Sequence, residues 1–427
     1  MGIALGIILV VILGFIIFKK PYVGLIIVIV CEFAGFATLI PDLGTIRFLG
    51  LMVGFLILGW IKGLFFDRNI EVPSYQQNWA QLGFLFVMGI SGFFAYIHAT
   101  AFFAFLQHLG IIILYFIIIS LLDTHYKLKG FILAYLLVNA YMAYLGLYNY
   151  FILEKDIDNL ATGGFAAGGD DFAVIISAAI PFSFYLYQAE RSIKLKMFYA
   201  LLTIVFITAV ICAFSRGGWV TLIGIIFLLT IFSSYRLRTI TIILIAFLIV
   251  FYTLPPRFAD EFNTIFTEYS TKTGTTEQRF ELWKAGFQMF LDHPIIGIGM
   301  LNFASVYGRF YMPQNAESHV WLHAHSIYFT LISELGLLGT VFFVLIVYWI
   351  IKDNWFIIKR LKNTHQTNPL PFALSQSLMV SLLGYLLGGI FLSILYYPPL
   401  YIMAALTVAL RNTVEKGEKD FKDAATI

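Results

Sequence analysis

Long apolar runs are the feature of this sequence that most restricts its fold. They recur along the 427 residues, and each is about 17–25 residues long, the length that a helix needs to cross a bilayer core. In lipid, backbone polar groups are satisfied only within helices or closed β-barrels. Barrel strands would alternate apolar and polar residues, whereas a run such as Thr239–Tyr252 is continuously apolar. With 60% hydrophobic and 12% charged residues, the sequence predicts an all-α, polytopic transmembrane helix bundle.

We expect 12 or 13 spans, the doubt resting on the two shortest runs at the N-terminus. The runs lie near residues 2–18, 22–40, 47–64, 80–97, 101–122, 129–150, 172–188, 197–214, 218–232, 238–255, 326–350, 371–394 and 398–411. This pattern divides the chain into N-terminal transmembrane helices (1–255), a large extracytoplasmic loop with an amphipathic helix (256–325), C-terminal transmembrane helices (326–411) and a cytoplasmic tail (412–427).

The distribution of Lys and Arg predicts the orientation of the bundle. Of the 27 basic residues, 19 fall in one alternating set of connections: Lys19, Lys20, Lys62, Arg68, Lys127, Lys129, Arg191, Lys194, Lys196, Arg236, Arg238, Lys352, Lys359, Arg360, Lys362, Arg411, Lys416, Lys419 and Lys422. Because basic loops stay on the cytoplasmic side, we expect a multi-pass protein of a bacterial inner membrane. Its C-terminus is then cytoplasmic, and its long loop faces the periplasm or the outside.

Composition also excludes several classes of site. The two cysteines, Cys31 and Cys212, both lie in apolar runs, so neither a disulfide framework nor a zinc cluster can be built from them. Gly2–Phe18 has no basic segment before it and is expected to be an uncleaved span rather than a signal peptide. The expected partners are membrane lipids and not nucleic acid, and no cofactor is expected.

The long loop is rich in aromatic and polar residues, which is unusual for a simple connector. Thr275 and Gln278 match a capping box, and four aromatic residues follow at helical spacing: Phe280, Trp283, Phe287 and Phe290. We expect an amphipathic helix here, lying on the outer leaflet or packed against the bundle. Gly297 and Gly299 lack the preceding strand of a dinucleotide site, so that interpretation is rejected.

Three short motifs occur one after another along the chain. The first is Ser215-Arg-Gly-Gly-Trp219 at the outer end of a span. The second is Gln278-Arg279 with Trp283, followed by His293-Pro-Ile-Ile-Gly-Ile-Gly299 and Asn302-Phe303. The third is His323-Ala-His325-Ser326, leading into Glu334-Leu-Gly336. In this order the three motifs resemble the O-antigen ligase and polymerase family of bacterial surface-glycan enzymes. The segment from Gly163 through Asp171 to Pro181 also looks like one that the family carries. The chain departs from the pattern at Ser326, where the family often has Asn.

The resemblance implies transfer of a glycan from undecaprenyl diphosphate to an acceptor on the outer face, where the acceptor is a lipid, a growing glycan or a protein side chain. The leaving diphosphate is anionic, and arginine binds phosphate oxygens through a planar, permanently charged fork. Arg216 and Arg279 are therefore the expected diphosphate ligands, and Gly217 would let a phosphate approach the backbone. The competing interpretations are a snorkelling interface arginine for Arg216 and a solvated helix face for Arg279.

An acceptor hydroxyl must lose a proton as it attacks the anomeric carbon. The reference pKa of histidine, about 6.5, suits that role, and His325 matches the family's position at the outer mouth of a span. His325 is therefore the expected catalytic base in a single displacement with inversion. His323, Asp171 and Trp283 are expected to support it.

A divalent metal is the competing way to hold the diphosphate. Asp156 and Asp158 form a DxD pattern on the outer face, and Asp170 and Asp171 lie nearby. Acidic pairs occur often by chance, and two arginines can replace a metal's charge, so the expected mechanism is metal-independent. For Glu334, which lies inside a predicted span, a packing or hydrogen-bonding role is expected.

Three functional hypotheses remain open from the sequence. The first is a glycan ligase, or a polymerase with the same motifs. The second is a transporter of lipid-linked glycan or of small anions, which would place charges near the middle of the bilayer on broken helices. The third is a non-catalytic subunit of an envelope complex. The position of the candidate charges at the outer surface favours the first.

Overall fold

A computed structural model describes residues 2–35, 48–152, 168–233, 275–312, 322–362 and 369–425, with a few isolated positions between 237 and 245. Every regular element within these ranges is helical, which confirms the all-α fold. The α-helices are α1 (Gly2–Lys19), α2 (Pro21–Phe33), α5 (Phe48–Phe65), α6 (Gln76–Phe93), α7 (His98–Leu121), α8 (His125–Phe151), α9 (Gly169–Ala189), α10 (Ile193–Ile211), α11 (Arg216–Phe232), α14 (Thr275–Asp292), α15 (Phe303–Val306), α16 (Ile327–Leu361), α17 (Pro369–Gly388) and α18 (Pro398–Ala425). A π-helical turn, η2 (Tyr307–Tyr311), follows α15.

The predicted spans coincide with these helices. Within the described ranges, seven helices are long and apolar enough to cross a membrane: α5, α7, α8, α9, α10, α16 and α17. Apolar stretches of α1, α2 and α11 are shorter. Each predicted span except the one at 238–255, which lies almost wholly outside the described residues, overlaps one helix. The polytopic helical bundle is therefore confirmed.

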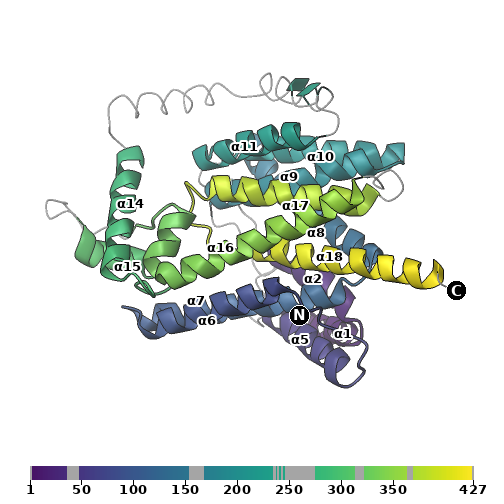
Figure 1. Ribbon diagram of the computed structural model, residues 1–427, viewed down its shortest axis with the longest axis horizontal. Coiled ribbons are helices and arrows are strands. Elements are labelled where there is room, and N and C mark those ends of the chain that lie inside the picture. Colours follow the sequence, from purple (N-terminus) through teal and green to yellow (C-terminus); the bar gives the residue numbers. More distant parts are fainter. Residues whose placement is uncertain are drawn as a thin grey trace.

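Most helices lie side by side along the long axis of the molecule, while α14 runs across the ends of several of them (Figure 1). We call the end at which α14 and α15 lie the site end. Helix α9 is central, because every residue from Phe172 to Leu186 is buried. Small residues bring α17 close to α9: the hydroxyl of Ser381 donates to the carbonyl of Ala178 at 2.8 Å. Such hydrogen bonds between closely packed helices are typical of membrane bundles.

Helix α16 is broken near the site end. Gly336 has φ 61° and ψ −158°, a backbone conformation that is essentially restricted to glycine. The break separates the carbonyls of Ser333 and Glu334 from the amides of Leu337 and Leu338, which would be their partners in a continuous helix. In an apolar interior these four groups need other partners.

The segment that follows α14 supplies all four partners. Ile298 N donates to Ser333 O at 2.9 Å, and Gly299 N donates to Glu334 O at 3.0 Å. In return, Leu337 N donates to Pro294 O at 2.8 Å, and Leu338 N donates to Ile295 O at 3.1 Å. The His-Pro-Ile-Ile-Gly-Ile-Gly motif and the Glu-Leu-Gly motif are therefore the two halves of one interlocked structure.

The Glu334 side chain also holds this segment, through hydrogen bonds to the residues at its C-terminal end. It is 1% exposed and accepts hydrogen bonds from Leu301 N at 2.8 Å, from Phe303 N at 3.0 Å and from the Tyr396 hydroxyl at 2.7 Å. A buried carboxyl group is tolerated when its oxygens are satisfied in this way. The expected hydrogen-bonding role of Glu334 is thus confirmed.

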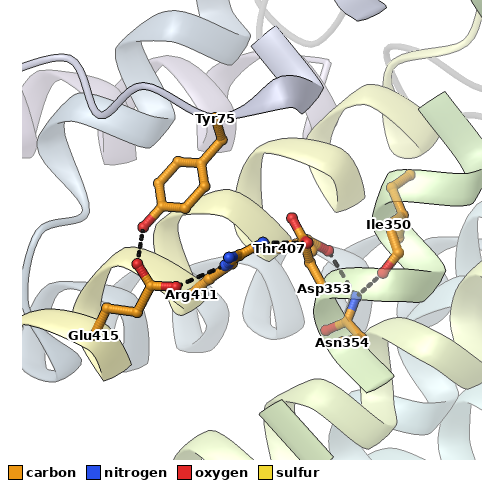
Figure 2. A network of polar contacts seen from close by, with 7 residues as sticks. All are labelled: Tyr75, Ile350, Asp353, Asn354, Thr407, Arg411 and Glu415. Atoms are coloured by element: carbon orange, nitrogen blue, oxygen red, sulfur yellow. Dashed lines mark hydrogen bonds and ion pairs between the residues drawn. The ribbon is translucent and has the colours of Figure 1, made fainter. Parts of the chain in front are cut away.

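A second polar cluster joins α16 and α18 at the opposite end (Figure 2). Arg411 forms an ion pair with Asp353 at 2.5 Å and another with Glu415 at 2.8 Å. The Tyr75 hydroxyl, just before α6, donates to Glu415 at 2.9 Å. Helix α18 runs without interruption through this cluster to Ala425.

Replacing Gly336 with alanine should destabilise the fold. The new Cβ would lie 2.6 Å from the carbonyl carbon and oxygen of Ile295, and the backbone conformation alone costs a non-glycine residue about 1–3 kcal/mol. Gly110→Ala is the matched control, because nothing lies within 4 Å of its Cβ position and alanine favours the helix by about 0.5–1 kcal/mol. Thermal unfolding in detergent should show a lower midpoint only for Gly336→Ala. Equal midpoints would contradict the described break.

Replacing Glu334 with glutamine should release the segment that Glu334 holds. The amide keeps the size but turns one acceptor into a donor facing a backbone N–H or the tyrosine hydroxyl, and each buried group left unpaired costs about 1–3 kcal/mol. Tyr396→Phe, which removes one bond and leaves both amides paired, should cost less. Limited proteolysis at residues 294–303 measures the difference, and equal cleavage in the two variants would argue against the assigned role.

Candidate functional site

A tryptophan on helix α14 forms a hydrogen bond to the segment that precedes α16. The Trp283 indole N–H donates to the carbonyl of Ala324 at 3.0 Å, and its ring stacks on Phe329 at 5.4 Å. The fully buried face of α14 consists of Leu282, Ala285, Gly286 and Met289. The spacing of aromatic residues had suggested a face of four aromatics. Two of these residues, Phe280 and Phe287, are instead 61% and 50% exposed.

His325 directly follows the residue that Trp283 holds. It is half-buried and has a positive φ of 46°, which is uncommon for a residue with a side chain and is characteristic of functional sites. Arg279 lies one helical turn before Trp283, so both residues face the same side of α14. In this way α14 places the guanidinium of Arg279 within electrostatic range of the His325 ring.

The charges around His325 determine its protonation. Burial lowers the pKa of His325, the neighbouring Arg279 lowers it further, Asp170 raises it, and His323 lowers it again. The net effect is a pKa below the ordinary value of 6.5. At neutral pH the imidazole is therefore uncharged and available to accept a proton, the state that a general base requires.

Asp170 is a functional candidate that the sequence reasoning did not select. It lies in the first turn of α9, where the helix dipole favours a carboxylate, and it accepts a hydrogen bond from the Ser215 hydroxyl. Ser215 is the N-cap of α11, and its hydroxyl also accepts the N–H of Gly218 at 2.9 Å. Asp170 thus connects the start of α11 to His325. In the sequence the only signal was the pair Asp170-Asp171. This pair does not indicate which of the two aspartates interacts with His325.

Asp171, the residue proposed from the sequence, forms a different contact. Its carboxylate is hydrogen bonded to the Tyr397 side chain, and burial together with this carboxylate raises the pKa of Tyr397. Tyr397 belongs to the connection between α17 and α18, so Asp171 fixes that connection to the start of α9.

Arg216 begins α11, next to the Ser215 that binds Asp170, and its side chain is half-buried. The two glycines that follow it allow close packing: a Cβ at Gly217 would lie 3.3 Å from Leu392, and one at Gly218 would lie 2.4 Å from the Cβ of Ala173. Protein atoms therefore occupy the space beside both glycines. Approach of a phosphate to the backbone of Gly217 stays a prediction.

The structure brings Arg279, His323, Asp170 and His325 together, with Arg216 on the neighbouring helix end. His323 is exposed. Ser326, where the resemblance had suggested Asn, is the N-cap of α16 without a side-chain capping bond. Its buried hydroxyl has no hydrogen-bond partner among the described residues.

The described residues contain no group of three or more His, Cys, Asp or Glu side chains that could hold a metal ion. Asp156 and Asp158, the residues of the competing metal hypothesis, lie outside the described residues, as do Gly163 and the loop residues before Thr275.

Comparison with known proteins identifies the segment that forms this site. A family model described as O-antigen ligase matches residues 172–344, from the first turn of α9 into α16. The match encloses Arg216, Arg279, His325 and Glu334, whereas Asp170 lies just before it. No curated protein matches the chain. Over residues 172–344 the chain is therefore similar to the O-antigen ligase family that its motifs resemble.

Proposed function

We propose that this protein transfers a glycan from undecaprenyl diphosphate to an acceptor hydroxyl or amide at the site end. The family match supports a membrane glycosyltransferase of the O-antigen ligase or polymerase type. The proposed donor, acceptor class and mechanism are argued from the individual residues of the candidate site. The observation that carries the proposal is a half-buried histidine with a lowered pKa, in electrostatic range of an arginine and an aspartate.

In the proposed step, His325 accepts the proton of the acceptor as the acceptor oxygen or nitrogen attacks the anomeric carbon. The bond from that carbon to the phosphate oxygen breaks, and the electron pair leaves with the diphosphate. One displacement inverts the anomeric centre, and no bond to the protein forms. A positioned general base contributes about 10²–10⁴-fold to the rate of such a step.

Arg279 and Arg216 are proposed to stabilise the leaving diphosphate. Fixed positive charge in a partly dry site is effective because the surrounding dielectric is low. Arg279 has a second effect, since its charge lowers the pKa of His325. The same guanidinium would therefore bind the leaving group and keep the base uncharged before the reaction. With this charge supplied by arginine, we propose that no metal is required.

Asp170 is proposed as a positioning residue for His325. Once the imidazole has taken the proton, it carries a positive charge next to Arg279, which is unfavourable. The Asp170 carboxylate offsets that charge, and its hydrogen bond to Ser215 fixes it in place.

The transporter hypothesis is less well supported. A carrier of lipid-linked glycan or small anions would bind its cargo with unwound backbone groups inside the membrane. Helix α16 is broken at Gly336, but the backbone groups of Ser333, Glu334, Leu337 and Leu338 are bonded to the loop. A polymerase, whose acceptor is a growing glycan, would use the same residues as a ligase. We further propose, from the distribution of Lys and Arg, that the site end faces outward and that the C-terminus is cytoplasmic.

His325→Ala should lower transfer by about 10²–10⁴-fold, with a smaller effect on donor binding, because the base acts only as the proton moves. His323→Ala is the matched control, since that side chain is exposed, and it should retain most of the activity. The assay follows product formation from lipid-linked glycan by the purified protein in the presence of EDTA. Full activity in His325→Ala would remove the proposed base, and dependence on added metal would remove the metal-free mechanism.

Two substitutions should shift the pH profile of kcat/KM in opposite directions. His325 must be uncharged, so activity is lost as the pH falls through its pKa. Asp170 raises that pKa and Arg279 lowers it. Asp170→Asn should therefore move the acid limb to lower pH, and Arg279→Gln should move it to higher pH, besides weakening transfer. If both variants lost activity without a shift of the limb, neither charge would act through His325.

A further inference from the structure

Helix α7 carries a histidine whose ring is enclosed by the bundle. His108 is 1% exposed, and neither ring nitrogen has a hydrogen-bond partner among the described residues. The surrounding rings are those of Phe84 at 5.9 Å, Tyr401 at 4.5 Å and Tyr396 at 6.3 Å. Buried polar atoms are almost always hydrogen bonded, and one without a protein partner indicates a bound water.

Helix α6 presents two further unpaired side chains to the bundle interior. Gln77 and Gln81 are 1% and 0% exposed, and their four amide atoms have no partner among the described residues. They lie one turn apart on the face of α6 that also carries Phe84, which contacts His108.

Gln81 and His108 lie at comparable depths, and Gln77 lies one further turn from the site end. Counted from the turn that joins α6 and α7 at the site end, Gln81 is twelve residues below Phe93, or about 18 Å. His108 is ten residues below His98, or about 15 Å. Gln81 and His108 thus bring four unpaired polar atoms to similar depths in the interior of the bundle, and Gln77 adds two more one turn away. Lipid offers none of them a partner.

We propose that water molecules occupy the interior between α6, α7 and α18, bridge His108 to Gln81 and Gln77, and make His108 a buried proton-exchange site. Each water can join two to four polar groups, so a few molecules satisfy all six atoms. Ionisable groups inside membrane bundles generally have a function. This site lies apart from the glycan-transfer residues and does not depend on the proposed function.

Hydrogen-bonding groups continue from this site toward both ends of the bundle. Toward the site end, the Tyr396 ring borders His108, and its hydroxyl donates to Glu334, which holds residues 301–303. Toward the opposite end, Asn78, next to Gln77, accepts the Tyr115 hydroxyl at 2.8 Å. Beyond it lies Tyr75, a member of the cluster in Figure 2. Water is proposed to enter from this opposite end.

The test is solid-state NMR of the full-length protein in lipid bilayers, with histidine labelled by ¹⁵N. His108→Phe, which fills a similar volume, identifies the His108 ring signal by its disappearance. We expect that signal to receive magnetisation from water, more slowly than the exposed His323. Absence of transfer to His108 after the His323 signal has reached its plateau would overturn the proposal.

A double variant tests the lining of the site. Gln77→Leu with Gln81→Leu keeps the side-chain size and removes the four amide atoms. We expect a marked loss of water transfer to His108, with the folded protein verified by its size-exclusion profile and thermal unfolding. Unchanged transfer in the folded double variant would show that the glutamines do not hold the water. If the double variant does not fold, water transfer to His108 is compared in the same way for Gln81→Leu alone, and that result decides.

Discussion

The bundle depends on one constraint, that backbone polar groups removed from water must find partners. Helix α16 meets it in an unusual way, because its own hydrogen bonds stop at Gly336 and the loop segment at Pro294–Gly299 completes them. Each side supplies two donors and two acceptors. The loop and the helix therefore satisfy each other, and the loop is as much a part of the bundle as the spans. Gly297, whose Cβ would lie 2.3 Å from the carbonyl carbon of Glu334, shows how closely the two backbones approach.

On this framework the site joins elements that lie far apart in the sequence. Helix α9 supplies Asp170, α11 supplies Ser215 and Arg216, α14 supplies Arg279, and the residue pair before α16 supplies His325. Opposite charges act on the histidine, and burial, the largest effect, lowers its pKa. The residue proposed as the base is thus uncharged at neutral pH.

Much of this architecture could be predicted from the sequence, for physical reasons. A bilayer imposes a length and a polarity on each span, so the helices α5 to α11 and α16 to α18 lie close to the apolar runs. The motifs also selected Arg279 and His325, two residues that interact electrostatically in the structure, whereas their functional roles stay predictions. Interactions between distant segments were not predictable in the same way. Nothing local distinguishes Asp170 from Asp171, because the orientation of α9 decides which of them faces His325.

The exposed aromatic residues of α14 are a second example of what a local sequence pattern cannot predict. Helical spacing correctly predicted a helix beginning at Thr275, but in a membrane protein apolar residues face lipid as well as the core. The aromatic pattern could not tell which side of α14 would be buried, and smaller residues such as Ala285 and Met289 form that side. Likewise, Glu334 was expected to form hydrogen bonds, but its partners at Leu301 and Phe303 depend on a loop path that no local pattern defines.

The bond between the Trp283 indole and the carbonyl of Ala324 has a mechanical consequence. Arg279 lies one turn before the donor of that bond, and His325 follows its acceptor directly. The cationic ligand and the base are therefore mounted on a single rigid unit. Loss of this one bond would change the distance between the proposed diphosphate ligand and the proposed base, so phosphate binding and proton abstraction would be impaired together.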